Sequence, residues 1–358
     1  MDHRLQLLTR WVSQLPGLAN TAVAPVAGDA SFRRYFRVWR SADWQQPRAL
    51  EKAPGAQAYQ ALIVMDAPPE HENCRPFVTL AQHWRSQGVK VPVIVQQDLA
   101  QGFLLMEDFG DRLLLGQLNA ANADKLYRNA LAELLRIQQL PDNPDDPLAT
   151  YSNDLLDREM ALFRDWLLQR QLRLELNDSD RAMLSNTFAL LRESANAQPK
   201  VPVHRDYQSR NLLVTGDDDR PGVIDFQDAV IGPVTYDLVS LLKDCYVQWP
   251  HERVQTWLES YHQSSLNAGL HSADAATFRQ WFELMGMQRH LKAAGIFARL
   301  ALRDGKPDYL NDIPRTLGYL CSASRRQPAL RPFHDWLLST VVPAVNATLG
   351  PVPGAHQP

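Results

Sequence analysis

The chain has 358 residues, of which 45% are hydrophobic and 22% are charged, and its formal net charge is -3. This length suggests about two domains and allows a sizeable buried core. The small net charge gives no reason to expect a nucleic acid or an anionic membrane as a partner.

Cysteine use and the lack of long apolar runs bear on the compartment. The three cysteines, Cys74, Cys245 and Cys321, are far apart and odd in number, so they form neither a zinc-site spacing nor a disulfide framework. No apolar run approaches the roughly 20 residues that span a bilayer, and the first residues lack the pattern of a signal peptide. We therefore expect a soluble, cytoplasmic protein with no membrane partner.

The N-terminal part of the chain predicts a helix followed by a sheet. Apolar residues recur at helical spacing from Leu5 to Leu15, where Pro16-Gly17 ends the segment. Strand-like runs follow over residues 21–27, 32–39, 61–65, 91–96 and 102–106, with a helix over residues 76–87. We expect an antiparallel sheet of about five strands with a covering helix.

The turn between the first two predicted strands is made of small and polar residues: Gly28, Asp29, Ala30 and Ser31. Such a turn can fold over phosphate groups and offer them backbone N–H groups and a hydroxyl, although glycine and aspartate in a hairpin are often only turn residues. Arg33 and Arg34 follow, and either could neutralise phosphate or lie on a solvated strand edge.

The chain leaves the predicted sheet at residues 106–110 and then becomes mainly helical. Apolar stripes predict helices around residues 126–137, 156–167, 183–191, 257–261, 282–302 and 336–345, with another opening near Tyr236. Asp237 would lie in the first turn of that helix, either capping it or bracing the preceding loop. His290 is more typical of a satisfied core residue than of a ligand. The tail from Gly350 is expected to be disordered.

The strongest chemical pattern lies in residues 203–228. Asp206 and Asn211 are five residues apart on a predicted loop, and after a short strand and a polar turn a second strand delivers Asp225. Phosphoryl transfer needs a carboxylate that orients the attacking hydroxyl and oxygen ligands for magnesium. A polar turn can be rich in Asp and Asn for backbone reasons alone, but the joint pattern favours a phosphotransferase site.

Two departures separate this pattern from that of protein kinases. Gln227 stands where the glycine that follows the second metal-binding motif would be. Protein kinases also carry a lysine on the third strand, paired with a glutamate on the next helix. Here Met65 has the lysine's expected place and residues 76–87 contain no glutamate, which would leave the phosphates to Arg33, Arg34 or Lys52.

Four stretches, residues 28–38, 65–70, 204–214 and 223–238, together resemble the aminoglycoside-phosphotransferase superfamily of small-molecule kinases. Within it, the chain looks closest to the bacterial N-acetylmuramate/N-acetylglucosamine anomeric sugar kinases. The resemblance implies an α+β, bilobal, protein-kinase-like fold. Residues 1–108 would form a nucleotide-binding lobe with the antiparallel sheet and a helix, and residues 109–349 a larger, mainly helical lobe carrying the catalytic hairpin, followed by a disordered tail over residues 350–358.

The resemblance also implies an activity and its cofactors. ATP and Mg²⁺ would be used to phosphorylate the anomeric hydroxyl of a small amino sugar in peptidoglycan recycling. By position, Asp206 would be the base, and Asn211 and Asp225 would hold magnesium. The phosphates and adenine would meet Gly28 to Ser31, Arg34, Glu107 and Phe109. The sugar would meet Gln208, Arg210 and Asp228. Arg205 stands where many members of the superfamily have glycine.

Two other functions compete with this interpretation. An aminoglycoside phosphotransferase would need an acidic substrate pocket, whereas the helices after residue 230 carry mixed charge. A nucleotide-binding pseudokinase that serves as a scaffold would fit the missing strand lysine. The presence of Asp206, Asn211 and Asp225 argues against the scaffold.

Overall fold

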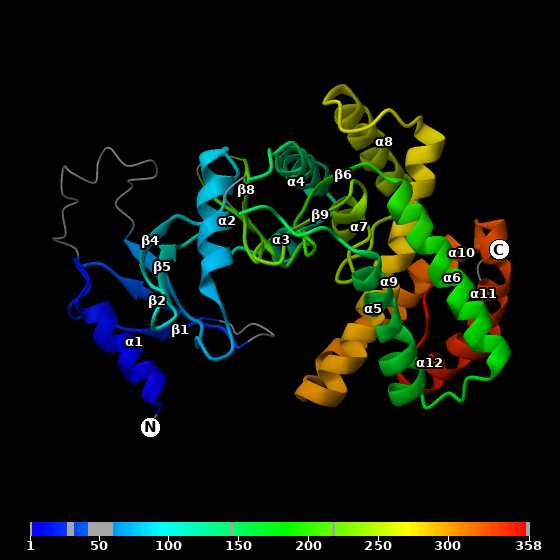
Figure 1. Ribbon diagram of the computed structural model, residues 1–358, viewed down its shortest axis with the longest axis horizontal. Helices are drawn as coiled ribbons and strands as arrows, with labels where there is room; N and C mark the ends of the chain where they lie inside the picture. The colour runs from blue at the N-terminus through cyan, green and yellow to red at the C-terminus, as the bar shows by residue number, and fades with distance from the viewer. Residues whose placement is uncertain (1, 27–31, 42–59, 144–145, 217–218, 356–358) are drawn as a thin grey trace. The chain divides into compact units, whose positions relative to one another are not determined.

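The computed structural model describes residues 2–26, 32–41, 60–143, 146–216 and 219–355 (Figure 1). The chain divides into two compact units. Unit 1 consists of Met1–Gln117 and Leu212–Gln227, and unit 2 of Leu118–Asn211 and Asp228–Pro358. The predicted turn over residues 28–31, the candidate cation Lys52 and the last three residues of the predicted tail lie outside the described residues.

Unit 1 contains the expected antiparallel sheet of five strands, in the order β1-β2-β3-β5-β4. The strands are β1 (Ala24–Pro25), β2 (Arg34–Trp39), β3 (Ala61–Asp66), β4 (Ile94–Asp98) and β5 (Phe103–Glu107). Its helices are α1 (His3–Ser13), α2 (Cys74–Ser86) and the short α3 (Leu114–Gln117). The predicted helix and sheet are therefore confirmed, with strand ends that differ by a few residues.

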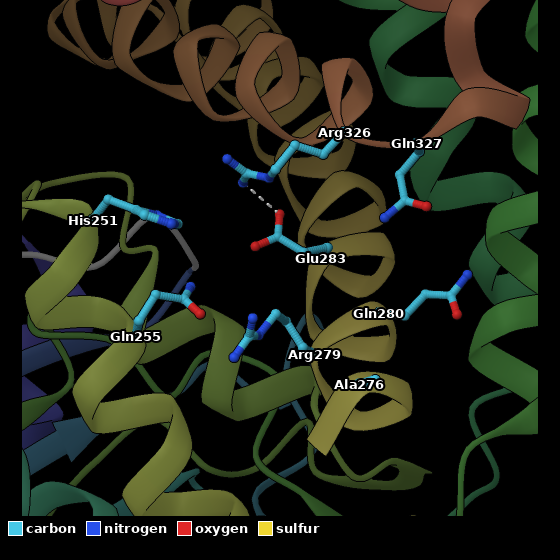
Figure 2. A pocket seen from close by; sticks show the side chains of 8 residues that line it. All are labelled: His251, Gln255, Ala276, Arg279, Gln280, Glu283, Arg326 and Gln327. Atoms are coloured by element: carbon cyan, nitrogen blue, oxygen red, sulfur yellow. Dashed lines mark hydrogen bonds and ion pairs between the residues drawn. The ribbon is translucent and has the colours of Figure 1, made fainter. Parts of the chain in front are cut away.

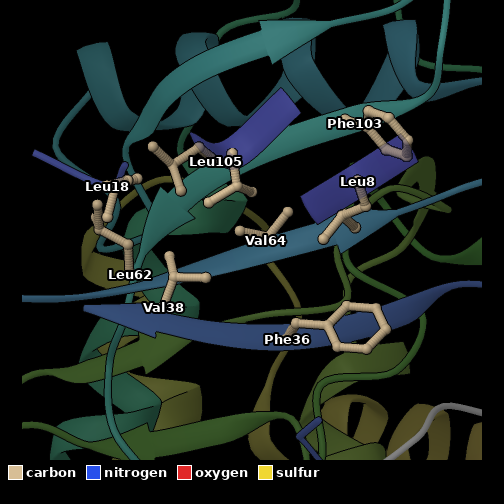
Figure 3. Packing of buried hydrophobic residues seen from close by; sticks show 9 residues of the cluster. Leu8, Leu18, Phe36, Val38, Leu62, Val64, Phe103 and Leu105 are labelled. Carbon is tan, nitrogen blue, oxygen red and sulfur yellow. The ribbon is translucent and has the colours of Figure 1, made fainter. Parts of the chain in front are cut away.

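One face of this sheet packs on α1 (Figure 3). The cluster consists of Leu8, Val12, Leu18, Phe36, Val38, Leu62, Val64, Phe103 and Leu105. Because successive side chains of a strand point to opposite faces, Phe36 and Val38 belong to this face, and Tyr35 and Arg37 to the other. Each large apolar side chain buried in this way contributes about 1.5–3 kcal/mol to stability.

The predicted hairpin forms from β7 (Leu212–Val214) and β8 (Pro221–Val223). In the structure the hairpin belongs to unit 1, and the predicted lobe boundaries stay a prediction. The backbone N–H of Val223 donates to the carbonyl of Lys90 at 2.8 Å, and the Phe226 ring lies 4.9 Å from that of Phe77 on α2. A two-stranded hairpin has no core of its own, so these contacts with Lys90 and Phe77 determine where it packs.

Unit 2 is mainly helical, as expected. Its α-helices are α4 (Ala123–Gln138), α5 (Asn153–Leu162), α6 (Asp178–Ala197), α7 (Tyr236–Leu242), α8 (His251–Asn267), α9 (Ala275–Asp304), α10 (Ile313–Arg325), α11 (Arg331–Trp336) and α12 (Val342–Thr348). Segments Phe163–Gln171 and Leu337–Val341 are π-helical, and Pro307–Asp312 and Pro328–Leu330 are 3₁₀ turns. No helix within the described ranges is both long and apolar enough to cross a membrane.

The long helix α9 organises unit 2, since it contacts α5, α6, α7 and α10 (Figure 1). At Gly295 it passes so close to the end of α5 that a Cβ atom would lie 2.3 Å from the carbonyl carbon of Leu162. Glycine is therefore required at this crossing.

Two features of unit 2 differ from the sequence prediction. Strands β6 (Lys200–Val203) and β9 (Val230–Pro233) pair antiparallel, although neither was expected. Residues 350–355, expected to be disordered, are ordered instead: Val352 and Ala355 are buried, and the Val352 N–H donates to the side chain of Asn346 at 2.9 Å. A tail can be fixed by a few such contacts that its own composition does not reveal.

Candidate active site

The loop that carries Asp206 follows β6 in unit 2 and is braced by Asp237 of α7. The Asp237 carboxylate is fully buried and accepts the backbone N–H groups of His204 at 2.6 Å and Arg205 at 3.0 Å. Burial raises the pKa of this carboxyl to about 6, against the lowering effect of His204 and the two N–H groups. Of the two roles considered for Asp237, the structure supports the brace.

A second buried carboxylate holds the other end of the loop. Asp244 accepts both the backbone N–H and the hydroxyl of Ser209, at 2.8 and 2.6 Å. Between these braces, the Asn211 side-chain nitrogen donates to the carbonyl of Asp206 at 2.9 Å. This contact fixes the Asn211 side chain, whose amide oxygen is the atom able to bind a metal ion.

Arg205 adopts a left-handed backbone conformation, with φ of 74°. A non-glycine residue pays about 1–3 kcal/mol for such a conformation, whereas glycine would adopt it freely. Here the conformation is held by an ion pair with Glu159 at 2.8 Å and by Arg289, which donates to the Arg205 carbonyl at 2.9 Å. These contacts explain how arginine is tolerated next to Asp206.

Asp206 itself is half-buried, and its N–H donates to the ring Nδ1 of His204 at 3.3 Å. Burial opposes ionisation of the carboxyl, but the positive charges of Lys292 and Arg289 on α9 outweigh it and lower the pKa of Asp206. The carboxyl is therefore ionised at neutral pH. An ionised carboxylate on a fixed loop can accept a hydroxyl proton and orient the oxygen.

The α9 cations belong to a buried network that the sequence analysis missed. Lys292 contacts the Glu159 carboxylate at 3.2 Å and the Tyr236 hydroxyl at 3.0 Å. Lys292 and Arg205 lower the pKa of Glu159 to about 2 although burial raises it. The available signal was the presence of charged residues on the apolar stripe predicted over residues 282–302, because a buried charge requires a partner.

Asp225 lies in unit 1, just after β8, and also has a left-handed backbone, with φ of 63°. The Gln227 side chain donates to its carboxylate at 2.8 Å. Gln227, which replaces the glycine of the protein-kinase motif, thus orients the predicted metal ligand. The Arg33 guanidinium also approaches the Asp225 carboxylate, at 3.9 Å, and pairs with Glu72 at 3.0 Å.

Arg34, Glu107 and Phe109 have structural partners within unit 1. Arg34 donates to Asp66 at 2.5 Å and also pairs with Asp2, on the side of the sheet that faces α1. The Glu107 carboxylate accepts the N–H of Val93 at 3.2 Å. A Cβ atom at Gly222 would lie 2.5 Å from the Phe109 ring, so this ring packs on the hairpin. None of these contacts tests the predicted role in nucleotide binding, which stays a prediction.

The residues predicted to meet the sugar are in unit 2. Gln208 lies within the braced loop, where its N–H donates to the Asp206 carbonyl at 2.9 Å. Arg210 is exposed, with its guanidinium 4.5 Å from the centre of the Tyr246 ring. Asp228 is also exposed. His290 is a satisfied core residue, as expected, since it is buried and bonds the Lys243 carbonyl at 2.9 Å.

Over the part of the chain that the structure describes, no three His, Cys, Asp or Glu side chains are grouped to hold a metal ion. Proteins usually bind Mg²⁺ through one or two carboxylates together with substrate phosphates and water. Asn211 and Asp225 each supply oxygen donors of the kind that Mg²⁺ prefers, and the contacts of each side chain within its own unit fix its orientation.

A separate hollow of about 350 Å³ lies in unit 2 between α8, α9 and the end of α10 (Figure 2). Its lining residues are His251, Gln255, Ala276, Arg279, Gln280, Glu283, Arg326 and Gln327. The Glu283 carboxylate pairs with Arg326 and with Lys243, both at 2.9 Å. None of the predicted site residues lines this hollow, and its buried charge is neutralised internally, so we do not assign the reaction to it.

Comparisons with known proteins agree with this chemistry. Residues 22–276 match the model of the phosphotransferase enzyme family. The chain is 45% identical to the N-acetylmuramate/N-acetylglucosamine kinase of Pseudomonas putida, over 92% of this chain and 94% of that protein. It is 42% identical to the protein of the same name from Pseudomonas aeruginosa, over 94% and 97% of the two chains.

Solved structures show the same fold at low sequence identity. An ADP-bound aminoglycoside phosphotransferase superposes with a TM-score of 0.56 at 14% identity, covering 89% of this chain and 98% of that one. An ethanolamine kinase from Plasmodium vivax gives a TM-score of 0.62 at 11% identity, covering 92% and 89%. The expected kinase-like α+β fold is thereby confirmed.

Proposed function

The chain belongs to the phosphotransferase enzyme family, and we propose that it is a kinase that transfers phosphate from ATP to the anomeric hydroxyl of N-acetylmuramate and N-acetylglucosamine. The products are the sugar 1-phosphates, and the setting is peptidoglycan recycling. Relatives named for these two sugars are 37–45% identical over most of both chains, which supports the choice of substrate. Because the reaction consumes ATP, we propose that it takes place in the cytoplasm.

The observation that carries the reaction is the braced loop of unit 2, with an ionised carboxylate at its centre. Asp206 binds the anomeric hydroxyl, orients its oxygen and accepts its proton. The buried braces Asp237 and Asp244 keep the carboxylate in place before substrate arrives, so little reorganisation is needed in the reaction. Lys292 and Arg289 keep it ionised.

The residues proposed for Mg²⁺ are Asn211 and Asp225, through side-chain oxygens. Bound with the nucleotide, Mg²⁺ neutralises phosphate charge. For the sugar we retain Gln208, Arg210 and Asp228. The lactyl carboxylate of N-acetylmuramate calls for a guanidinium partner, and Arg210 is the exposed arginine of the braced loop.

The proposal is tested by ADP release from Mg–ATP with N-acetylmuramate, N-acetylglucosamine, kanamycin or no acceptor. We expect turnover with the two amino sugars alone and an acid-labile product, as an anomeric phosphate is. Asp206→Asn should lower kcat by about 10²–10⁴-fold, the usual contribution of a general base, and the variant should still fold. Turnover with kanamycin only, Mg–ATP binding without turnover on any acceptor, or full activity in Asp206→Asn would refute the assignment.

A further inference from the structure

The cation missing from the third strand of the sheet has a counterpart directly before the neighbouring strand. In β3, Met65 has the place where kinases carry a phosphate-binding lysine, and it is buried and apolar. Met65 pairs with Tyr35 of β2 in the antiparallel register. Cross-strand partners lie on the same face of a sheet, so Tyr35 and Met65 share one face.

Arg33 directly precedes β2, two residues before Tyr35. Side chains two residues apart along an extended chain point the same way, so Arg33 extends the face of Tyr35 and Met65. Arg34 points to the opposite face, where Asp66 binds it. The two adjacent arginines therefore have different surroundings, and only Arg33 is on the side expected of the missing lysine.

The contacts of Arg33 match that position. Its guanidinium donates to the Glu72 carboxylate at 3.0 Å and approaches Asp225 at 3.9 Å. Only 13% of the Arg33 side chain and 16% of the Glu72 side chain are exposed. Glu72 lies two residues before α2, the helix that follows β3. A cation thus lies between a carboxylate at the start of this helix and the proposed metal ligand.

We propose that Arg33, anchored by Glu72, binds the nucleotide phosphates in place of the strand lysine. The Arg33–Glu72 pair, just before β2, then has the role that a lysine–glutamate pair has on β3 and the next helix in protein kinases. An arginine suits this place because its planar fork can hold a carboxylate and a phosphate oxygen at once. The inference rests on the proposed function only for Mg–ATP binding, and the identity of the sugar does not enter it.

The test measures binding of Mg–ADP and of adenosine to the whole protein by calorimetry, without turnover. Arg33→Gln should weaken Mg–ADP binding by about tenfold or more, the effect of losing one charge-assisted contact, and leave adenosine binding unchanged. Glu72→Gln should weaken Mg–ADP less, because Arg33 loses its anchor but keeps its charge. In turnover with the sugar, the same variants should raise KM for ATP more than KM for the sugar.

The matched control is Arg75→Gln, which removes one positive charge from an exposed arginine of α2 in the same unit. It should bind Mg–ADP as the parent does. If Arg33→Gln does not fold, Arg33→Lys serves instead. Lysine keeps the positive charge but lacks the planar fork of arginine, so the loss of binding affinity should again be confined to Mg–ADP.

Parent-like Mg–ADP affinity in Arg33→Gln would overturn the inference, as would an equal loss for Mg–ADP and adenosine. Arg33-dependent Mg–ADP binding in a protein that phosphorylates no sugar would leave this inference standing and refute the proposed function. If the parent protein phosphorylates the sugar and Arg33→Gln keeps full Mg–ADP affinity, the proposed function stands and this inference is refuted.

Discussion

The two regions that carry the proposed chemistry are supported in opposite ways. The Asp206 loop of unit 2 is held by fully buried carboxylates and by the cations of α9. Asp225 of unit 1 is held by Gln227 and Arg33, and a third of its side chain, 33%, is exposed. Removing one partner from a buried ion pair is strongly destabilising, whereas exposed pairs contribute little. We therefore expect changes near Asp206 to affect folding as well as rate, and changes near Asp225 to affect ligand binding almost alone.

The largest effect should come from Glu159→Gln, which breaks the buried network behind the loop. It leaves Lys292 and Arg205 without their carboxylate, and removal of one partner from a buried pair typically costs about 3–5 kcal/mol. Chemical denaturation measures the loss. The matched control is Asp157→Asn on the same helix, whose partner Arg192 is at 2.6 Å in a partly exposed pair, so it should cost less than about 1 kcal/mol.

The same variant gives a pH signature. The pKa of Glu159 is lowered from 4.5 to about 2, so the stability that its ionised form contributes is present above pH 4.5 and is lost as the pH falls towards 2. Melting temperatures over this range should fall less steeply in Glu159→Gln than in the parent. The pKa of Asp237 is instead raised from 3.8 to about 6, so its pH dependence is the reverse. The stability that Asp237 contributes is present below pH 3.8 and is lost as the pH rises through 6. An identical acid slope in Glu159→Gln would contradict the network.

Asp237→Ala should come next. Two backbone N–H groups would lose their buried acceptor, and each unsatisfied buried group costs about 1–3 kcal/mol. Because the same groups hold the loop, kcat should fall with stability. Asp154→Ala is the control, since Asp154 has the same place in the first turn of α5 but is exposed. A stable Asp237→Ala enzyme with parent kcat would remove the contrast between the two regions.

Asp225→Asn should have the smallest effect on stability, below about 1 kcal/mol, because its ion pair with Arg33 is long and partly exposed. Asparagine also tolerates the left-handed backbone at this position. Mg²⁺-dependent nucleotide binding should nevertheless be lost, since an amide lacks the negative charge. Calorimetry with ADP, with and without Mg²⁺, checks the loss, and a large drop in melting temperature would show that Asp225 is structural.

Much of the fold was readable from local patterns. Helical spacing in residues 5–15 and 126–137 indicated α1 and α4, and the two short apolar runs after Asn211 indicated the hairpin. The pair β6–β9 was missed because its strands are four residues each, contain proline, and are joined across 26 residues of loop and hairpin. A strand that short is defined by its partner rather than by its own composition.

The candidate site, like the fold, could be predicted only in part from the sequence. The spacing of Asp206, Asn211 and Asp225 indicated the chemistry without any structure. The arginine before β2 that approaches Asp225 could not be distinguished from its neighbour by sequence, since Arg33 and Arg34 differ only in the face to which they point. The role of Asp237 also stayed open until its partners were known.

The sequence by itself determined most of the elements, the family and the residue types that carry the proposed chemistry, because these depend on spacing along the chain. Only the tertiary structure decided which groups become partners. Lys292 acts on the charge of Asp206, Arg33 donates to Glu72, and the hairpin packs against α2. These contacts join residues far apart in sequence. Their strength comes from shared burial and charge, which exist only once the chain has folded.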